Sequence, residues 1–250
     1  MKISSVIITK NEAENIAKCL NSIENIVSEI ILIDDFSVDK TIEIAESFPR
    51  IRVFQRKFDN FITQKNYGNS KVENEFILSL DADEYVDGGF GYFINNVDFT
   101  KHLAISFPRI NYIAGKRICF GIWKSDRKIR LWKKELGNWT GPLPHERLDL
   151  PISLMVLKSD IPIHHNAYNS LDQLYVKANK YGELAAKRLI SKPYVLLIFG
   201  LLINPVFKFV KGYVFLQGFR DGFEGFHIAA SSFIETCIKY SQAIQIKWKQ

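Results

Sequence analysis

Apolar and polar positions alternate between two patterns over the first hundred residues. Short continuous apolar runs, as expected for buried strands, occupy residues 3–9, 29–34, 52–54 and 76–81. Stretches with helical spacing of apolar residues separate these runs, at residues 12–26, 40–48 and 61–70. Strands that alternate with helices predict a mainly parallel sheet with right-handed crossovers and helices on its flanks.

A different pattern begins near residue 103. Short apolar runs up to residue 165 are separated by hairpin signals that contain Gly, at residues 113–117 and 139–142. We expect this region to extend the sheet, making it mixed, and to supply loops that cover a site. Helical periodicity returns at residues 169–190, with Ser170 as the expected cap. The predicted organisation is an α/β domain over residues 1–168 and a helical extension over residues 169–250.

The predicted extension contains a strongly apolar segment at residues 194–207, interrupted by Asn204 and Pro205. Fourteen residues are too few to cross a bilayer as a helix. Lys208 and Lys211 follow, and then an aromatic-rich stretch. This combination predicts a monotopic or re-entrant segment in the membrane interface, with its lysines at the level of the lipid headgroups. A buried helical hairpin of an ordinary soluble domain is the alternative.

Charge is unevenly distributed along the chain. From residue 187 to the end there are nine Lys or Arg and three Asp or Glu. Residues 1–186 therefore hold 24 basic and 24 acidic residues and are neutral overall. This asymmetry predicts that the C-terminal third meets an anionic surface. The basic residues are interleaved with long aliphatic runs, which makes nucleic acid a poor candidate for the partner.

Cysteine usage and the N-terminal sequence indicate the compartment. The three cysteines are far apart in the sequence and resemble neither a disulfide framework nor a zinc cluster. The apolar run near the N-terminus is shorter than the core of a signal peptide. We therefore expect reduced thiols and a cytoplasmic protein, peripheral or monotopic at the inner face of the cytoplasmic membrane.

The most informative chemistry lies at residues 76–84, an apolar strand that ends in Asp81 and Asp83. Side chains two apart on an extended segment point to the same side, so these carboxylates are expected to project together. Mg²⁺ and Mn²⁺ are commonly held by one or two carboxylates, with substrate phosphates completing the shell. The pair therefore predicts a divalent-cation site, and a solvated turn after a strand is the alternative.

Polar residues also follow the two earlier strands. Residues 9–12 end the first strand and Asp34-Asp35 end the second. In parallel sheets, ligands bind at the carboxyl ends of the strands. We therefore expect these residues and the Asp81–Asp83 pair to form one ligand-binding edge.

Ordered motifs along most of the chain carry a resemblance to a known family. They are Val6-Ile-Ile-Thr-Lys-Asn-Glu12, Ile31-Leu-Ile-Asp-Asp-Phe-Ser37 with Asp39-Lys-Thr41, Gln64-Lys-Asn66, Ser79-Leu-Asp-Ala-Asp-Glu84, Arg130-Leu-Trp132, Pro144-His-Glu146 and Gly218-Phe-Arg-Asp-Gly222. With these motifs the chain resembles the inverting family 2 glycosyltransferases of GT-A fold. It is most similar to the bacterial branch that includes lipopolysaccharide-core β-glucosyltransferases. One departure is Asp35-Phe36, where many relatives have Ser-Gly.

The resemblance implies roles for individual residues. Thr9, Asn11 and Glu12 would line the nucleotide pocket. From the residues alone, Asn11 is also a candidate N-cap that forms a capping box with Glu14. Further nucleotide contacts are implied for Asp34, Asp35, Lys65 and Arg130. Asp83 would contact the metal, and Asp81 would contact either the ribose or the metal.

Structural alternatives exist for several of these residues. Asp34 and Asp35 could form an Asx turn before a helix capped by Ser37 or Asp39. Lys65 could be an exposed helix lysine, and Trp132 and Trp139 could stack on a sugar or pack in the core. Arg127 is a second candidate for the diphosphate.

An inverting transfer also needs a general base that takes the proton of the acceptor hydroxyl. The resemblance favours Glu146, with Asp87 and Glu84 as rivals and with a surface Glu paired to Arg147 as the structural alternative. His164 and His165 end an apolar strand. His164 is a candidate for the metal shell or a phosphate contact, and His165 is left out of the ligand set.

The leading hypothesis is a metal-dependent hexosyltransferase that uses Mg²⁺ or Mn²⁺. It would move sugar from a nucleotide-sugar donor, UDP-linked by preference, to a saccharide or lipid-linked acceptor, as in lipopolysaccharide core or other cell-envelope glycan synthesis. A polyprenyl-phosphate sugar transferase and a catalytically silent nucleotide-sugar-binding relative are alternatives. A phosphohydrolase would need the DxD motif on its first strand, and an EF-hand would need Gly where Val86 stands.

Overall fold

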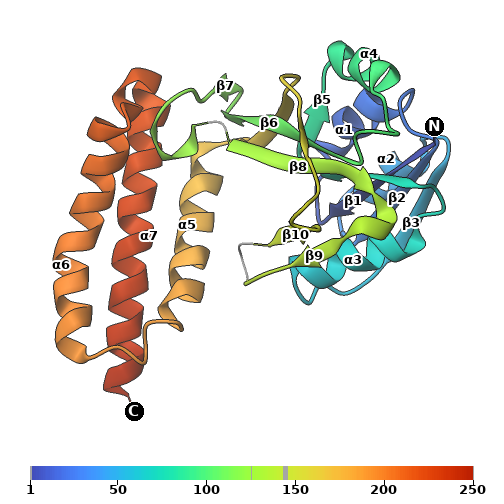
Figure 1. Cartoon of the computed structure of the whole chain (residues 1–250). Helices are drawn as coiled ribbons and strands as arrows, with labels where there is room; N and C mark the ends of the chain where they lie inside the picture. The colour runs from blue at the N-terminus through green and yellow to red at the C-terminus, as the bar shows by residue number, and fades with distance from the viewer. Residues whose placement is uncertain (1, 125, 143–145, 250) are drawn as a thin grey trace. The chain divides into compact units, whose positions relative to one another are not determined.

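The computed structural model describes residues 2–124, 126–142 and 146–249 (Figure 1). They form two compact units, one of residues 1–109 with 127–165 and the other of residues 110–126 with 166–250. Pro144 and His145 of the predicted Pro-His-Glu motif lie outside the described residues, whereas Glu146 lies within them.

The first unit is built on a mixed sheet with strand order β3-β2-β1-β4-β8-β6-β12-β5. Its four parallel strands are β1 (Ile3–Thr9), β2 (Glu29–Asp34), β3 (Ile51–Gln55) and β4 (Phe76–Asp81). The strands that follow are β5 (Glu84–Val86), β6 (Ala104–Ile113), β8 (Asp126–Lys133), β11 (Leu157–Lys158) and β12 (Ile163–Tyr168). The antiparallel pairing of β8 with β4 makes the sheet mixed, as the sequence predicts.

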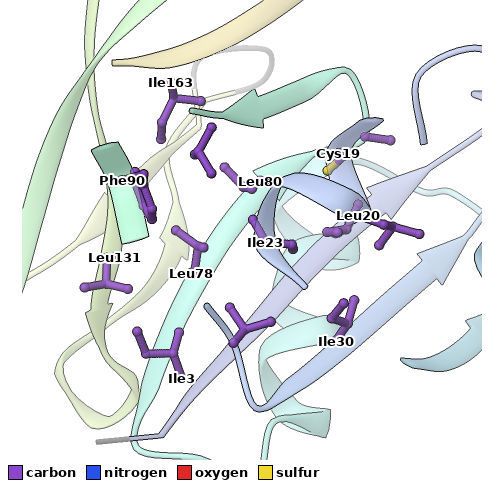
Figure 2. Close-up of a cluster of buried hydrophobic side chains, with 14 of the residues drawn as sticks. Ile3, Cys19, Leu20, Ile23, Ile30, Leu78, Leu80, Phe90, Leu131 and Ile163 are labelled. Carbon is purple, nitrogen blue, oxygen red and sulfur yellow. The ribbon is translucent and has the colours of Figure 1, made fainter. Parts of the chain in front are cut away.

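Helices cover both faces of the parallel strands because those strands are apolar on both sides. They are α1 (Ile16–Ile23), α2 (Thr41–Glu46), α3 (Phe61–Lys71) and α4 (Gly88–Asn96). Ile3 of β1 belongs to one buried cluster with Leu20 of α1 and Phe90 of α4 (Figure 2), and Val6 belongs to a second cluster with Trp132 on the other face.

Two short elements complete this unit. A separate antiparallel pair is formed by β9 (Asn138–Thr140) and β10 (Arg147–Asp149). A 3₁₀ turn at Lys134–Leu136 precedes β9. The hairpin predicted around residues 139–142 is therefore present as β9 and β10.

The second unit is helical, with α5 (Leu171–Ala186), α6 (Tyr194–Val210) and α7 (Gly222–Trp248) side by side (Figure 1). Ser170 caps α5 as predicted, accepting a hydrogen bond from the Gln173 amide at 3.4 Å. A π turn at Lys211–Phe215 and a 3₁₀ turn at Gly218–Asp221 connect α6 to α7. The short strand β7 (Lys116–Arg117) and a 3₁₀ turn at Gly121–Trp123 also belong to this unit.

The grouping of residues 110–126 with the C-terminal helices differs from the predicted boundary at residue 168. The buried carboxylate of Asp221 accepts hydrogen bonds from the backbone amides of Cys119, at 3.1 Å, and Phe120, at 2.8 Å. Lys116 forms an ion pair with Glu224 at 2.6 Å. These long-range contacts join the loop to the start of α7.

The apolar segment predicted at residues 194–207 belongs to a longer helical stretch than the sequence indicated. Within the described residues, one helical stretch, Tyr194–Phe215, is long and apolar enough to cross a membrane by length and composition. It has 22 residues because helical backbone continues past Lys208 and Lys211. The length of the apolar run alone therefore does not exclude a span.

Candidate functional site

The carboxyl ends of the parallel strands gather the predicted residues at one edge of the sheet. Thr9 lies opposite Asp34 in the β1–β2 register, and Ile8 lies opposite Asp81 in the β1–β4 register. The Thr9 hydroxyl is buried and finds no hydrogen-bond partner in the described parts of the chain. A buried hydroxyl without a partner is costly unless a ligand or water satisfies it.

Asp34 is fully buried and is engaged by its own loop. Its Oδ2 accepts a hydrogen bond from the Ser37 amide at 2.8 Å, and its Oδ1 accepts one from the Ser37 hydroxyl. Both bonds reach three residues along the chain, one more than in the Asx turn considered as the structural alternative, and through them Asp34 shapes the loop at the strand end.

Asp35 is more accessible than Asp34. Its Oδ1 accepts a hydrogen bond from the Phe58 amide at 3.0 Å, and its Oδ2 lies 3.5 Å from the Lys10 ammonium. Of the two carboxylates, Asp35 is the better placed to meet a ligand.

The N-cap predicted at Asn11 is wrong. Asn11 has a left-handed backbone with φ of 53°, and its side-chain oxygen accepts a hydrogen bond from the Val38 amide at 2.9 Å. Helix α1 begins only at Ile16. Asn11 therefore joins the loops after β1 and β2, and no capping box with Glu14 starts the helix.

Glu12 lies at the same junction of loops. Its backbone amide donates to the Thr41 hydroxyl at 2.8 Å, and its Oε2 accepts from the Asn15 side chain at 2.8 Å. Asp39 Oδ1 accepts a hydrogen bond from the amide of Thr41, the first residue of α2, at 3.0 Å. These bonds fix the loops that border the ligand-binding edge.

Asp81 is held between two buried cations. Lys65 Nζ lies 3.1 Å from Oδ1, and Arg130 Nη2 donates to Oδ2 at 2.9 Å. Burial alone would raise the pKa of Asp81, but the charges of Lys65 and Arg130 outweigh it and hold this pKa well below its usual range. Asp81 is therefore a fixed carboxylate whose charge is already neutralised.

Arg130 is buried between Asp81 and Glu84. Burial would lower its pKa, whereas the charges of Glu84 and Asp81 raise the pKa well above the usual value. Glu84 is fully buried, pairs with Arg130 and lies 3.6 Å from Arg109 Nη1. A carboxylate enclosed in this way cannot reach an acceptor, so Glu84 is excluded as the rival base.

Asp83 lies in the turn between β4 and β5, so the alternation argument does not extend to it. Its side chain is 18% exposed, and its Oδ2 lies 3.5 Å from His165 Nε2. Its Oδ1 is buried and lacks a hydrogen-bond partner among the described residues. Of the two aspartates in the motif, Asp83 is the one with an oxygen available for a cation.

His165, and not the predicted candidate His164, lies next to Asp83. His165 faces Asp83, although it was left out of the predicted ligand set. His164 stacks on Tyr85 with ring centroids 4.9 Å apart and lies 3.6 Å from Asp87 Oδ2. Asp87 also caps α4 through the Gly89 amide at 3.0 Å, which gives this rival base a structural role.

Lys65, which pairs with Asp81, also pairs with Glu146. The Lys65 side chain is only 4% exposed, so the alternative of an exposed helix lysine is wrong. Its Nζ lies 3.6 Å from Glu146 Oε1 and 4.5 Å from the centroid of the Trp139 ring. The Glu146 side chain is 17% exposed. Among the described residues it forms an ion pair with Lys65 and not with Arg147.

Asn66 ties the β9–β10 hairpin to α3. Its side chain donates to the Trp139 carbonyl at 2.9 Å and accepts from the Trp139 amide at 2.8 Å. Asn66 belongs to the motif Gln64-Lys-Asn66, in which a role was expected only for Lys65. The contact holds β9 next to α3, the helix that carries Lys65.

The remaining candidates have structural roles. Arg127 donates to the carbonyls of Ser106, at 3.0 Å, and Ser159, at 2.6 Å. Trp132 and Trp139 are buried and meet edge to face, with ring centroids 5.8 Å apart. Core packing, the alternative to sugar stacking, is therefore the observed use of both tryptophans.

Asp83 and His165 form the best candidate for a cation site. Among the described residues, no group of three or more His, Cys, Asp or Glu is placed to hold a metal ion. Asp83 Oδ1 has no hydrogen-bond partner among the described residues, and Oδ2 lies 3.5 Å from His165 Nε2; this fits a site with few protein ligands, as Mg²⁺ or Mn²⁺ uses when substrate phosphates supply the others.

Comparison with known proteins identifies the family. The family model for glycosyl transferase family 2 matches residues 4–145, which is more than half of the chain. The chain therefore belongs to glycosyl transferase family 2, and the resemblance found in the sequence is confirmed.

Relatives cover most of the chain. An uncharacterized glycosyltransferase of Rickettsia felis is 28% identical over 242 residues, covering 90% of this chain and 83% of the relative. The lipopolysaccharide core biosynthesis glycosyltransferase LpsC of Rhizobium meliloti is 22% identical over 233 residues, covering 90% of this chain and 86% of the relative.

A solved structure shares the fold. The mannosyltransferase PcManGT of Pyrobaculum calidifontis, in complex with GDP-Man and Mn²⁺, has a TM-score of 0.51 and 13% identity, covering 77% of this chain and 65% of that chain. The predicted fold class, a GT-A-like mixed α/β sheet with a C-terminal helical region, is confirmed.

Proposed function

We propose that this glycosyltransferase is an inverting, metal-dependent hexosyltransferase that takes its sugar from a UDP-linked donor. Its acceptor would be a saccharide or lipid-linked glycan at the inner face of the cytoplasmic membrane, as in lipopolysaccharide core or other envelope glycan synthesis. The similarity to LpsC supports this class of acceptor. Residues 1–168 would carry catalysis, and residues 169–250 would carry membrane association.

One observation carries the proposal. Asp81 is neutralised by Lys65 and Arg130, while Asp83 keeps a buried oxygen without a partner in the described chain. This division leaves Asp83, with His165 at 3.5 Å, to hold the cation, and Asp81 to meet the donor as a fixed hydrogen-bond acceptor. A divalent cation at Asp83 would neutralise the charge that grows on the leaving nucleoside diphosphate.

The donor would bind along the carboxyl ends of the strands. Thr9 has a buried hydroxyl available for a hydrogen bond, and Asp35 is the accessible carboxylate for the base or ribose. Asn11, Glu12 and Asp34 would shape this pocket through the loops that they hold together. Lys65 and Arg130 would contribute positive charge close to the diphosphate.

Glu146 would act as the general base. Its carboxylate takes the proton of the acceptor hydroxyl while that oxygen attacks the anomeric carbon from the face opposite the diphosphate. The new carbon–oxygen bond forms as the bond to phosphate breaks, and the electron pair leaves with the nucleoside diphosphate. Back-side attack inverts the anomeric centre.

A polyprenyl-phosphate acceptor is the second candidate. The exposed apolar side chains of α6, such as Phe199 and Leu202, favour an acceptor that is itself embedded in lipid. Transfer to a polyprenyl phosphate, but not to a saccharide acceptor, would select this candidate.

Incubation with a panel of UDP-, GDP- and dTDP-sugars tests the proposed donor. We expect one UDP-sugar with Mn²⁺ to raise the melting temperature and to be hydrolysed slowly without acceptor. A different nucleotide would correct the donor. A thermal shift without hydrolysis or transfer would favour the catalytically silent alternative, and the absence of both shift and hydrolysis with every nucleotide sugar would contradict the proposed enzyme.

A further inference from the structure

Helix α6 is apolar around its whole circumference, yet only one of its faces is packed. Its inner face meets α7: a Cβ added at Gly200 would overlap the Tyr240 ring, and Asn204 donates to the Tyr240 hydroxyl at 2.8 Å. Its outer face exposes Val195, Leu196, Ile198, Phe199, Leu202, Ile203, Val206 and Phe207. We call these eight side chains the outer α6 face.

The apolar surface continues beyond α6 into the start of α7. The exposed side chains there are Val214, Phe215, Leu216, Phe219, Phe223 and Phe226. Many exposed apolar side chains on elements that contact one another mark a site that contacts a membrane or another protein.

The contacts along α6 and α7 show that the two helices run antiparallel and stay together over their length. Tyr194, at the start of α6, lies near Trp248 at the end of α7, with ring centroids 6.4 Å apart. Phe209, near the end of α6, meets Phe226 with ring centroids 5.8 Å apart. A helix paired in this way cannot cross a bilayer without taking α7 with it.

Helix α7 is unsuited to the hydrocarbon core of a membrane. It carries Glu235, Lys239 and Lys247 along its length. Burial, together with the charge of nearby Lys208, lowers the pKa of Lys239. Charged side chains are costly inside a bilayer, so the α6–α7 pair is better suited to lie on the membrane than to span it.

Charge distinguishes a membrane from a second copy of this chain. The sequence from residue 187 has nine basic residues and three acidic ones. Two of the acids are already engaged: Asp221 accepts from backbone amides, and Glu224 pairs with Lys116. Lys208 and Lys211 follow the outer α6 face directly. An identical basic surface would repel this one, whereas anionic lipid headgroups complement it.

We propose that α6 lies parallel to the surface of an anionic lipid bilayer, with the outer α6 face in the interface and α7 behind it. This inference deepens the membrane association proposed above, because it specifies the orientation. Lys208 and Lys211 reach the headgroups at one end of the helix.

Vesicle sedimentation of the full chain tests the surface. We expect binding to vesicles that contain phosphatidylglycerol and much weaker binding to pure phosphatidylcholine. Phe199→Glu combined with Leu202→Glu should abolish sedimentation, whereas Ile152→Glu, at an exposed apolar residue of the other unit, should not. Lys208→Gln combined with Lys211→Gln should weaken binding to anionic vesicles about 30-fold.

Depth measurements test the orientation. Cysteines at positions 196, 202 and 207, introduced one at a time in a Cys119→Ser and Cys237→Ser background that keeps only the buried Cys19, would carry a fluorophore quenched by brominated lipids. Similar shallow depths at all three positions support the proposal. Deep labels at 202 and 207, with a shallow label at 196, would show that the stretch Tyr194–Phe215 spans the bilayer and would overturn the proposal.

Two other results would also overturn the proposal. One is the absence of binding to anionic vesicles while circular dichroism shows a folded chain. The other is a dimer that the glutamate variant converts to monomer. Donor hydrolysis in solution is measured on the same variants, so loss of membrane binding with hydrolysis retained leaves the proposed enzyme activity standing.

Discussion

The ammonium nitrogen of Lys65 lies 3.6 Å from Oε1 of Glu146 while it also lies 3.1 Å from Oδ1 of Asp81. One buried lysine thus links the carboxylate assigned to the donor side with the carboxylate proposed as the base. Asn66, the next residue on α3, holds Trp139 of β9, the strand that precedes Glu146. In the proposed mechanism, the arrangement of donor site and base would therefore depend on two adjacent residues of one helix.

Glu146→Gln should abolish transfer without removing the donor. Loss of the base is expected to lower kcat for transfer about 100- to 10,000-fold. Donor binding, measured as the thermal shift with UDP-sugar and Mn²⁺, should persist because Glu146 contacts Lys65 and not Asp83. Glu135→Gln, at an exposed carboxylate, is the matched control. Transfer at the wild-type rate in Glu146→Gln would assign the base elsewhere.

Lys65→Met tests whether Lys65 acts through Glu146. If it does, kcat at saturating donor should fall, and the double variant with Glu146→Gln should be about as slow as Glu146→Gln alone. Lys71→Met changes a lysine on the same helix that lies over the Tyr67 ring, and it should leave kcat unchanged. Independent, multiplicative losses in the double variant would show that Lys65 does not position the base.

Asn66→Ala removes both hydrogen bonds to the Trp139 backbone. We expect the free energy of unfolding to fall by about 1–3 kcal/mol, because backbone groups lose their partners. Urea titration measures this change. Asn96→Ala, at an exposed asparagine that donates to Tyr92, should change stability by less than about 0.5 kcal/mol. Equal effects of the two substitutions would show that the Asn66 hydrogen bonds to the Trp139 backbone do not stabilise the protein.

Gly200→Val tests the close contact between α6 and α7. The new side chain would overlap the Tyr240 ring, so the helical unit is expected to lose about 1–3 kcal/mol or to separate locally. Thermal melts followed by circular dichroism measure the loss. Gly88→Ala is the control, since an added Cβ at Gly88 meets no atom within 4 Å in the described structure. An unchanged melt of Gly200→Val would mean that the helices are not in contact there.

Local sequence pattern predicted the strands well because each is a continuous apolar run between helices. β1, β2 and β4 have the predicted bounds. The start of α1 was misjudged because Asn11 uses its side chain on Val38, 27 residues away in the chain. A propensity for capping cannot reveal that a distant amide competes for the same oxygen.

The strand-end motifs predicted which residues come together at one edge of the sheet, but not the contacts among them. The choice between His164 and His165 depended on the antiparallel pairing of β12 with β5, which sets His165 opposite Glu84. The enclosure of Asp81 by Lys65 and Arg130 likewise comes from residues far apart in the sequence.

The most direct test of the central claim is calorimetric titration of Mn²⁺ into the protein saturated with its nucleotide-sugar donor. We compare wild type with Asp83→Asn and with Asp160→Asn, whose side chain is exposed. We expect a donor-dependent Mn²⁺ site in wild type and in Asp160→Asn. In folded Asp83→Asn we expect both this site and turnover to be lost. Full Mn²⁺ binding and full turnover in Asp83→Asn would contradict the claim that Asp83 holds the cation.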